Sequence, residues 1–197
     1  MIIIGASSGG LNALIRILPN IPKSFSFPII IVQHLQENEQ SELHEVLNKY
    51  TELPVTFAHD KDRLTAGMIF LAPPGYHLLI EAGNTLALSI DPPVSWARPS
   101  IDVLFESAAL FATVPVIAVV LTGASSDGSK GLNLIKKHGG LTIVQDPATA
   151  DVAVMPQAAI DNTEVDYILP LDEIGNFLTS LDKDHYLTVN QYETCTA

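Results

Sequence analysis

The sequence contains little cysteine and little positive charge. Its 197 residues include one cysteine, Cys195, and 10 lysines and arginines against 22 aspartates and glutamates, which gives a formal net charge of −12. A single cysteine forms no internal disulfide, and the absence of a CxxC pair argues against a structural zinc site. Because the basic residues are scattered, the sequence does not favour a nucleic-acid-binding surface, which needs clustered lysine and arginine.

Long apolar runs are missing as well. No stretch approaches the ~18 consecutive apolar residues that a membrane-spanning helix needs, and no basic segment followed by an apolar one opens the sequence. Together with the lone cysteine, this favours a cytoplasmic protein with no membrane insertion.

Short apolar runs alternate with helical patterns along most of the chain. Continuous apolar runs of this kind are typical of strands that are buried on both faces of a parallel sheet. Strands are expected at residues 2–4, 29–32, 55–58, 68–71, 116–121, 141–144 and 167–169, and helices at 11–18, 43–50, 101–108, 130–138, from Met155 onward and at 174–181. The segments 78–81 and 85–90 flank Gly83-Asn84 and predict a hairpin.

These patterns predict an α/β fold: a doubly wound, mostly parallel sheet with helices on both faces and an antiparallel hairpin insertion. No linker or repeat divides residues 1–181, which are expected to form one domain. From residue 182 the composition becomes polar and aperiodic, so residues 182–197 are expected to form a loosely ordered tail.

Three reactive side chains follow three of the predicted strands. Ser7, His34 and Asp127 all fall at the carboxyl-end edge of the sheet, where ligands bind in open α/β folds. A serine hydroxyl needs an imidazole to accept its proton and an acid to orient that imidazole, and these residues supply one of each. They are our candidate catalytic triad.

The segment around Ser7 fits the G-x-S-x-G pattern of a sharp strand-to-helix turn. The amides from Ser8 through Gly9 to Gly10 are expected to face an oxyanion that forms beside the Ser7 hydroxyl. Two simpler interpretations stay open: Ser7 as a small residue in a tight turn, and Asp127 as a helix cap.

The same glycine-rich turn is also typical of an NAD(P)-binding loop of the short-chain dehydrogenases. Those enzymes need a tyrosine followed four residues later by lysine, and none of the five tyrosines here has one. The second strand ends in Gln33-His34 and not in the acidic residue that binds an adenosine ribose. An NAD(P)-dependent oxidoreductase is therefore the weaker alternative.

Several spaced motifs, taken together, resemble the catalytic domain of the chemotaxis protein-glutamate methylesterases, the CheB family. The matching segments run from residue 2 to about 181 and are Ile4-Gly5-Ala6-Ser7-Ser8-Gly9-Gly10, Val32-Gln33-His34, Ala72-Pro73-Pro74-Gly75-Tyr76-His77, Arg98-Pro99-Ser100-Ile101-Asp102, Leu121-Thr122-Gly123 with Asp127-Gly128, Gln145-Asp146 and Met155-Pro156. The resemblance implies a hydrolase in chemotactic signal transduction that demethylates glutamate methyl esters on chemoreceptor-type proteins, with glutamine deamidation as a related activity. It implies Ser7 as nucleophile, His34 as general base and acid, and Asp127 as the orienting carboxylate, with no metal and no cofactor.

The chain also departs from the family pattern. Ala124 stands where the family usually has methionine, in a loop associated with the oxyanion, and Ala97 replaces a histidine before Arg98. These changes keep a third alternative open, a scaffold that binds receptor but has lost the chemistry. The resemblance also places the Arg98 loop over the active-site rim. Met155 is expected to pack near the crevice at the start of a helix, and His77 either to contact substrate or to begin the hairpin. The family's receiver domain does not precede the first strand, so we expect a stand-alone enzyme or one regulated by a separate receiver-domain protein.

Overall fold

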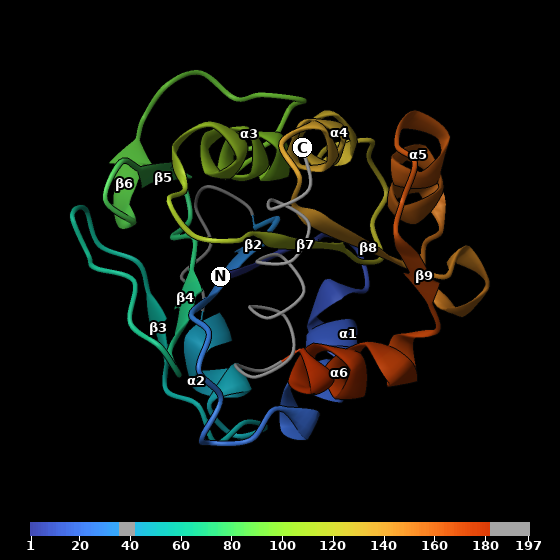
Figure 1. Cartoon of the computed structure of the whole chain (residues 1–197), viewed down its shortest axis with the longest axis horizontal. Coiled ribbons are helices and arrows are strands. Elements are labelled where there is room, and N and C mark those ends of the chain that lie inside the picture. Colours follow the sequence, from blue (N-terminus) through green and yellow to red (C-terminus); the bar gives the residue numbers. More distant parts are fainter. Residues whose placement is uncertain (36–41, 182–197) are drawn as a thin grey trace, which may run out of the picture.

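A parallel sheet forms the centre of the computed structural model, which describes residues 1–35 and 42–181 (Figure 1). Within these residues the sheet has seven strands in the order β3-β4-β2-β1-β7-β8-β9. Their bounds are β1 Ile2–Ala6, β2 Ile29–Gln33, β3 Val55–Phe57, β4 Ile69–Leu71, β7 Ile117–Val120, β8 Leu141–Gln145 and β9 Tyr167–Leu169. Because β1 is parallel to both β2 and β7, the loops after these three strands share one edge of the sheet, and the strand order reverses next to β1.

The central strands are buried on both faces, as the continuous apolar runs predict. Every residue of β1, β2 and β7 is buried. Within β1, Ile2 and Ile4 pack into one hydrophobic core while Ile3 packs into a second core. The alternation arises because successive side chains of a strand point to opposite faces.

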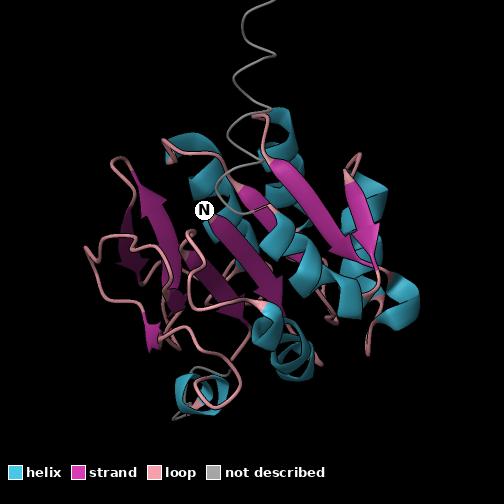
Figure 2. Cartoon of the chain, turned by 60° about the horizontal axis from the view of Figure 1, so that its bottom comes forward, coloured by secondary structure: helices cyan, strands magenta, loops and turns pink. Residues whose placement is uncertain are grey.

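Helices cover both faces of the sheet. Figure 1 shows the helices α1 (Gly10–Ile17), α2 (Leu43–Leu47) and α6 (Leu171–Ser180) on one side, and α3 (Ile101–Phe111), α4 (Ser129–Lys137) and α5 (Val154–Asn162) on the other. The turned view in Figure 2 again shows the strands between helices. Two short 3-10 helices span Leu18–Asn20 and Pro147–Thr149.

The hairpin forms a separate two-stranded antiparallel sheet of β5 (His77–Glu81) and β6 (Thr85–Ser89). It is fastened to α3, because the Ile80 amide donates a hydrogen bond to Ser107 Oγ at 3.0 Å. The predicted fold class, including this insertion, is confirmed.

Helix α2 is shorter than its apolar stripe predicts. It ends at Leu47, and the side chain of the next residue, Asn48, pairs with the backbone of Val55 at the start of β3. Asn48 Nδ2 donates to the Val55 carbonyl, and the Val55 amide donates to Asn48 Oδ1, both at 2.9 Å. These two hydrogen bonds use the Asn48 side chain to fix the start of β3.

No helix between residues 1 and 35 or between 42 and 181 has the length and apolar character required to cross a bilayer. The predicted tail, residues 182–197 with Cys195, lies outside the described residues.

Candidate active site

Ser7, His34 and Asp127 meet at the carboxyl ends of three adjacent strands. Because β1 lies between β2 and β7, the loops that follow these strands converge. Ser7 Oγ lies 3.1 Å from His34 Nδ1, and His34 Nε2 lies 2.8 Å from Asp127 Oδ2. A carboxylate can only accept, so the imidazole carries its proton on Nε2 and leaves Nδ1 to accept the Ser7 hydroxyl hydrogen.

The backbone also fixes the positions of Ser7 and His34. The Ser7 amide donates to the Thr122 carbonyl of the neighbouring loop at 3.0 Å, and the His34 amide donates to the Ala6 carbonyl at 3.0 Å. Both bonds extend the ladders of the parallel sheet beyond their last paired residues. The nucleophile and the imidazole therefore sit on extensions of the rigid sheet.

Asp127 is a fully buried carboxylate that accepts hydrogen bonds from several elements. Besides His34, its donors are Ser100 Oγ at 2.8 Å and three backbone amides: Ile101 at 2.7 Å, Asp102 at 3.0 Å and Gly128 at 3.1 Å. Burial acts to raise the pKa of Asp127, but the bonds from His34, Ile101 and Asp102 outweigh it and hold the pKa below its ordinary value. The carboxylate stays charged beside the imidazole.

The same carboxylate caps helix α3. Ser100 occupies the N-cap position, but its side chain makes no capping bond and donates to Asp127. The Asp127 carboxylate, which arrives from the β7–α4 loop, accepts the first amides of the helix instead. A negative charge is stabilised at a helix N-terminus, so the orienting acid is anchored by the helix it caps.

The turn after Ser7 is closed by Gly9 and Gly10. Gly9 has φ 81°, in the left-handed region that favours glycine, and the Gly10 amide donates to the Ser7 carbonyl at 2.8 Å. The expectation that the Gly10 amide faces an oxyanion is therefore wrong, since it already has an acceptor. Within residues 1–35 and 42–181, the amides of Ser8, Gly9 and Ala124 have no hydrogen-bond acceptor.

Gln33 is a site residue that the sequence did not single out. Its Nε2 donates to the Ser7 carbonyl at 2.9 Å and to the His34 carbonyl at 3.1 Å, so one amide joins the two loops. Its position offered a signal, because it is a polar residue at the end of an otherwise apolar, buried strand.

Thr122 has a similar bracing role on the other side of Ser7. Its Oγ1 donates to the Ser8 carbonyl and accepts from the Val152 amide, each at 2.9 Å. The Thr122 amide in turn donates to Oε1 of the buried Gln145 at 2.9 Å. The serine turn is thus held from both flanking loops.

His77 does not face the site. It is 1% exposed, Nδ1 accepts from the Ser100 amide at 3.2 Å, and Nε2 lies 3.1 Å from the Pro92 carbonyl. Both ring nitrogens are bonded within the protein, so His77 begins the hairpin and supports the Ser100 turn. The expectation of a substrate contact is wrong for this residue.

Arg98 and Met155 lie next to the site in supporting positions. Arg98 Nη1 donates to the carbonyls of Ile90 at 2.9 Å and Asp91 at 3.2 Å. Met155 is buried, and a methyl group added at Gly123 would lie 2.7 Å from Met155 Cε and 2.8 Å from Ser7 Cβ. Met155 therefore packs under the rim, against the loop that touches the nucleophile.

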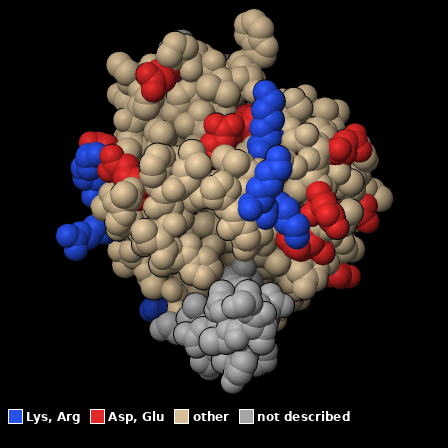
Figure 3. All heavy atoms as spheres, turned by 45° about the horizontal axis from the view of Figure 1, so that its top comes forward, with Lys and Arg blue, Asp and Glu red and all other residues tan. Residues whose placement is uncertain are grey.

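A row of basic side chains lies on the layer formed by α3, α4 and α5 (Figure 3). Helix α4 contributes Lys130, Lys136 and Lys137, and Lys136 pairs with Asp166. Acidic side chains flank this row, on a chain that as a whole is strongly negative.

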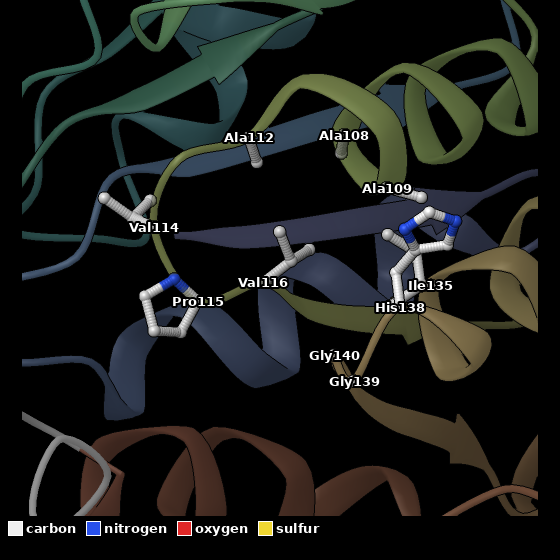
Figure 4. A pocket seen from close by; sticks show the side chains of 10 residues that line it. All are labelled: Ala108, Ala109, Ala112, Val114, Pro115, Val116, Ile135, His138, Gly139 and Gly140. Carbon is white, nitrogen blue, oxygen red and sulfur yellow. The ribbon is translucent and has the colours of Figure 1, made fainter. Parts of the chain in front are cut away.

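A cavity of about 90 Å³ lies elsewhere, between the carboxyl end of α3 and the start of β8 (Figure 4). Its lining includes Val116, which precedes β7, and His138, which follows α4. Because parallel strands begin at one edge and end at the other, this cavity lies at the edge opposite to Ser7. In the described part of the chain, no group of three or more histidine, cysteine, aspartate or glutamate side chains is placed to hold a metal ion.

Comparisons with known proteins agree on one family. The CheB methylesterase family model matches residues 2–178. The "Putative protein-glutamate methylesterase/protein-glutamine glutaminase" of Leptospira interrogans is 46% identical over 93% of this chain and 95% of its own length. The "Protein-glutamate methylesterase/protein-glutamine glutaminase" of Clostridium acetobutylicum is 33% identical over 89% of this chain, which spans 51% of that relative.

The structural comparison gives the same answer. The crystal structure of the Thermotoga maritima CheB methylesterase catalytic domain superposes with a TM-score of 0.87 at 35% sequence identity, covering 91% of this chain and 97% of that domain. With the family model matching nearly all of the described residues, the chain belongs to the CheB methylesterase family.

Proposed function

We propose that this chain is a serine hydrolase that demethylates glutamate methyl esters on chemoreceptor-type proteins. The observation that carries the proposal is the continuous series of hydrogen bonds from Ser7 Oγ through the two ring nitrogens of His34 to the Asp127 carboxylate. The names of the relatives supply the substrate class, and the series of bonds supplies a mechanism for it.

In the first half of the reaction, His34 Nδ1 takes the Ser7 proton as Oγ attacks the ester carbonyl carbon. Asp127 stabilises the imidazolium that forms. The negative charge on the carbonyl oxygen needs hydrogen-bond donors, and the unpartnered amides of Ser8, Gly9 and Ala124 are the candidates. His34 then returns the proton to the departing methoxide, so methanol leaves and glutamate stays esterified to Ser7.

In the second half, a water molecule replaces methanol. His34 Nδ1 accepts its proton, the hydroxide attacks the acyl carbon, and the proton is transferred to Ser7 Oγ as the bond breaks. Free glutamate carboxylate and intact serine result. A glutamine side chain would follow the same course with ammonia as the leaving group, which accounts for deamidation as a related activity. No step requires a metal or an organic cofactor.

The alanine at position 124 is compatible with this chemistry. A backbone amide is the donor in question, and alanine keeps it. The family match also favours hydrolysis over the oxidoreductase alternative. The proposal places the protein in the cytoplasm, with a methylated receptor as its partner.

A fluorophosphonate probe followed by mass spectrometry tests the proposal. Only an activated serine is labelled, and the modified peptide should contain Ser7 in the wild type and in the Ser8→Ala control, but not in Ser7→Ala. Methanol release from a methylated receptor fragment should follow the same pattern. Absence of labelling would support the inactive scaffold, and nicotinamide binding at millimolar cofactor with activity unaffected by the probe would support the oxidoreductase.

A further inference from the structure

The loop between β6 and α3 carries the chain's one tryptophan near its tip. Trp96 is 100% exposed, and two further apolar residues of the loop, Ile90 and Val94, are 72% and 39% exposed. In Figure 1 the loop arches over α3 from β6. Several large apolar side chains exposed on one loop are typical of a surface that binds another molecule.

The conformation of the tip is not one that tryptophan favours. Val94 and Ala97 exchange backbone hydrogen bonds of 3.1 and 2.9 Å, which closes a two-residue turn over Ser95 and Trp96. Both turn residues have positive φ, 51° and 64°, a conformation that asparagine and glycine adopt at lower cost. An exposed indole gains no burial in return, so folding alone does not account for tryptophan here.

The base of the loop is fixed to the body of the protein. Arg98 Nη1 binds the carbonyls of Ile90 and Asp91, and His77 Nε2 lies 3.1 Å from the Pro92 carbonyl. A side chain mounted on a constrained loop loses less conformational entropy on binding than one on a free loop.

The loop leads directly into the candidate active site. Trp96 precedes Ser100 by four residues, and Ser100 Oγ donates to Asp127 at 2.8 Å. A chain spans at most about 3.6 Å per residue, so the Cα atoms of Trp96 and Ser100 are within about 15 Å. A helix covers that length in about ten residues, which is within one helical segment of a protein substrate.

We infer that Trp96, with Ile90 and Val94, forms a docking surface for the protein substrate. An apolar side chain on the segment that carries the glutamate ester packs against the indole while the ester lies at Ser7. This inference rests on the proposed function. A small methyl ester is too short to reach the loop, so the surface contributes affinity only for the protein.

Kinetics with two substrates separate these contributions. The probes are a methylated helical fragment of a chemoreceptor cytoplasmic domain and N-acetylglutamate γ-methyl ester amide. Tryptophan is among the residues whose truncation most weakens interfaces, and we expect Trp96→Ala to raise KM for the fragment about 10- to 30-fold. Activity on the small ester should stay within about twofold of wild type, and Trp96→Phe should recover most of the loss.

Fluorescence gives a direct reading of the contact, because Trp96 is the chain's one tryptophan. The Ser7→Ala variant, which cannot turn over substrate, is titrated with a tryptophan-free methylated fragment. Binding should shift the emission to shorter wavelength and protect it from iodide quenching. Phe111→Ala is the matched control for the kinetics, since Phe111 is a half-exposed aromatic residue at the opposite end of α3.

The possible results are distinct. An unchanged KM for the fragment with Trp96→Ala, or an equal loss on both substrates, would overturn the docking surface, as would a shift in oligomeric state that identifies a second copy as the occupant. If wild-type protein releases methanol from neither substrate, the proposed function itself fails. A Trp96-dependent loss confined to the fragment would establish the docking surface.

Discussion

Gln33 Nε2 donates to the Ser7 carbonyl at 2.9 Å and so ties the nucleophile's turn to the end of β2. The same nitrogen reaches the His34 carbonyl at 3.1 Å. On its other side, Gln33 Oε1 lies 2.0 Å from the position that a Cβ at Gly10 would take, which leaves no space for a side chain there. One buried amide therefore sets the spacing between the hydroxyl and the imidazole.

Gln33→Leu should lower kcat for the small ester about 10- to 100-fold with a smaller effect on KM. Leucine fills similar volume but removes the side-chain donor to the His34 carbonyl and one of the two donors to the Ser7 carbonyl, which keeps the Gly10 amide. Small displacements of reacting groups are costly. Gln33→Glu should be worse, since a carboxylate would face two carbonyl oxygens. The rate of fluorophosphonate labelling measures the same loss without substrate binding. Equal effects on kcat and KM in both variants would contradict a positioning role.

Asp127→Asn should reduce activity and stability together. Activity should fall about 10⁴-fold, less than for Ser7→Ala, as in other triads. Asparagine also offers one acceptor oxygen in place of two to the donors from Ser100, Ile101 and Asp102, which should cost about 2 to 4 kcal/mol of unfolding free energy. Urea denaturation of both variants provides the check, with Ser7→Ala expected to unfold close to wild type.

The stability deficit of Asp127→Asn should depend on pH in one direction. The folded-state pKa of Asp127 is below its ordinary value of 3.8. Its contribution is therefore complete above about pH 4 and is lost as pH falls through the folded-state pKa. A deficit that grows on acidification would contradict this assignment.

Asp102→Asn should behave in the opposite way. Burial raises the pKa of Asp102 to about 6, with a smaller contribution from the Asp127 charge and against the lowering effect of the Gly131 amide bond. The unfolded chain releases this proton near pH 3.8 and the folded chain near pH 6, so stability decreases as pH rises between these values. In the Asp102→Asn variant, the asparagine side-chain oxygen still accepts the hydrogen bond from the Gly131 amide, but the negative charge is removed.

Relative to wild type, Asp102→Asn should therefore gain about 2 to 3 kcal/mol between pH 4 and pH 7. Urea unfolding at the two pH values measures it. Asp161→Asn, on the exposed surface of α5, is the control for removal of a negative charge. If the unfolding free energies of Asp102→Asn and wild type changed equally between the two pH values, a raised pKa of Asp102 would be excluded.

Gly123→Ala should lower activity at least 10-fold. The added methyl group would lie 2.7 Å from Met155 Cε and 2.8 Å from Ser7 Cβ, both shorter than ordinary contacts, so Ser7 or its loop must move. Gly83→Ala is the matched control, because its φ of 91° strains alanine but no atom lies within 4 Å. The control should cost about 1 kcal/mol of stability and leave kcat unchanged. Normal turnover by Gly123→Ala would show that the nucleophile tolerates displacement.

The sequence alone determined most of the secondary structure and the edge at which the chemistry lies. Short apolar runs bounded by turn residues, such as Ile29–Ile31, indicate strands because a strand buried on both faces hides consecutive apolar side chains. A polar residue directly after such a run must lie at the carboxyl end of its strand, which identified Ser7 and His34. These inferences depend only on residues that are neighbours in the sequence, so local sequence patterns are sufficient to make them.

Only the tertiary structure decided which strands are adjacent and which polar groups already have partners. The order β2-β1-β7 brings Asp127 to an imidazole 93 residues away, and no local pattern encodes such a pairing. The capping of α3 by Asp127, the two bonds of His77 and the Gly10 amide's use by Ser7 are likewise contacts between elements or across a turn. Hydrogen-bonding capacity belongs to the residue type, but whether it is free for a substrate depends on what packs beside it.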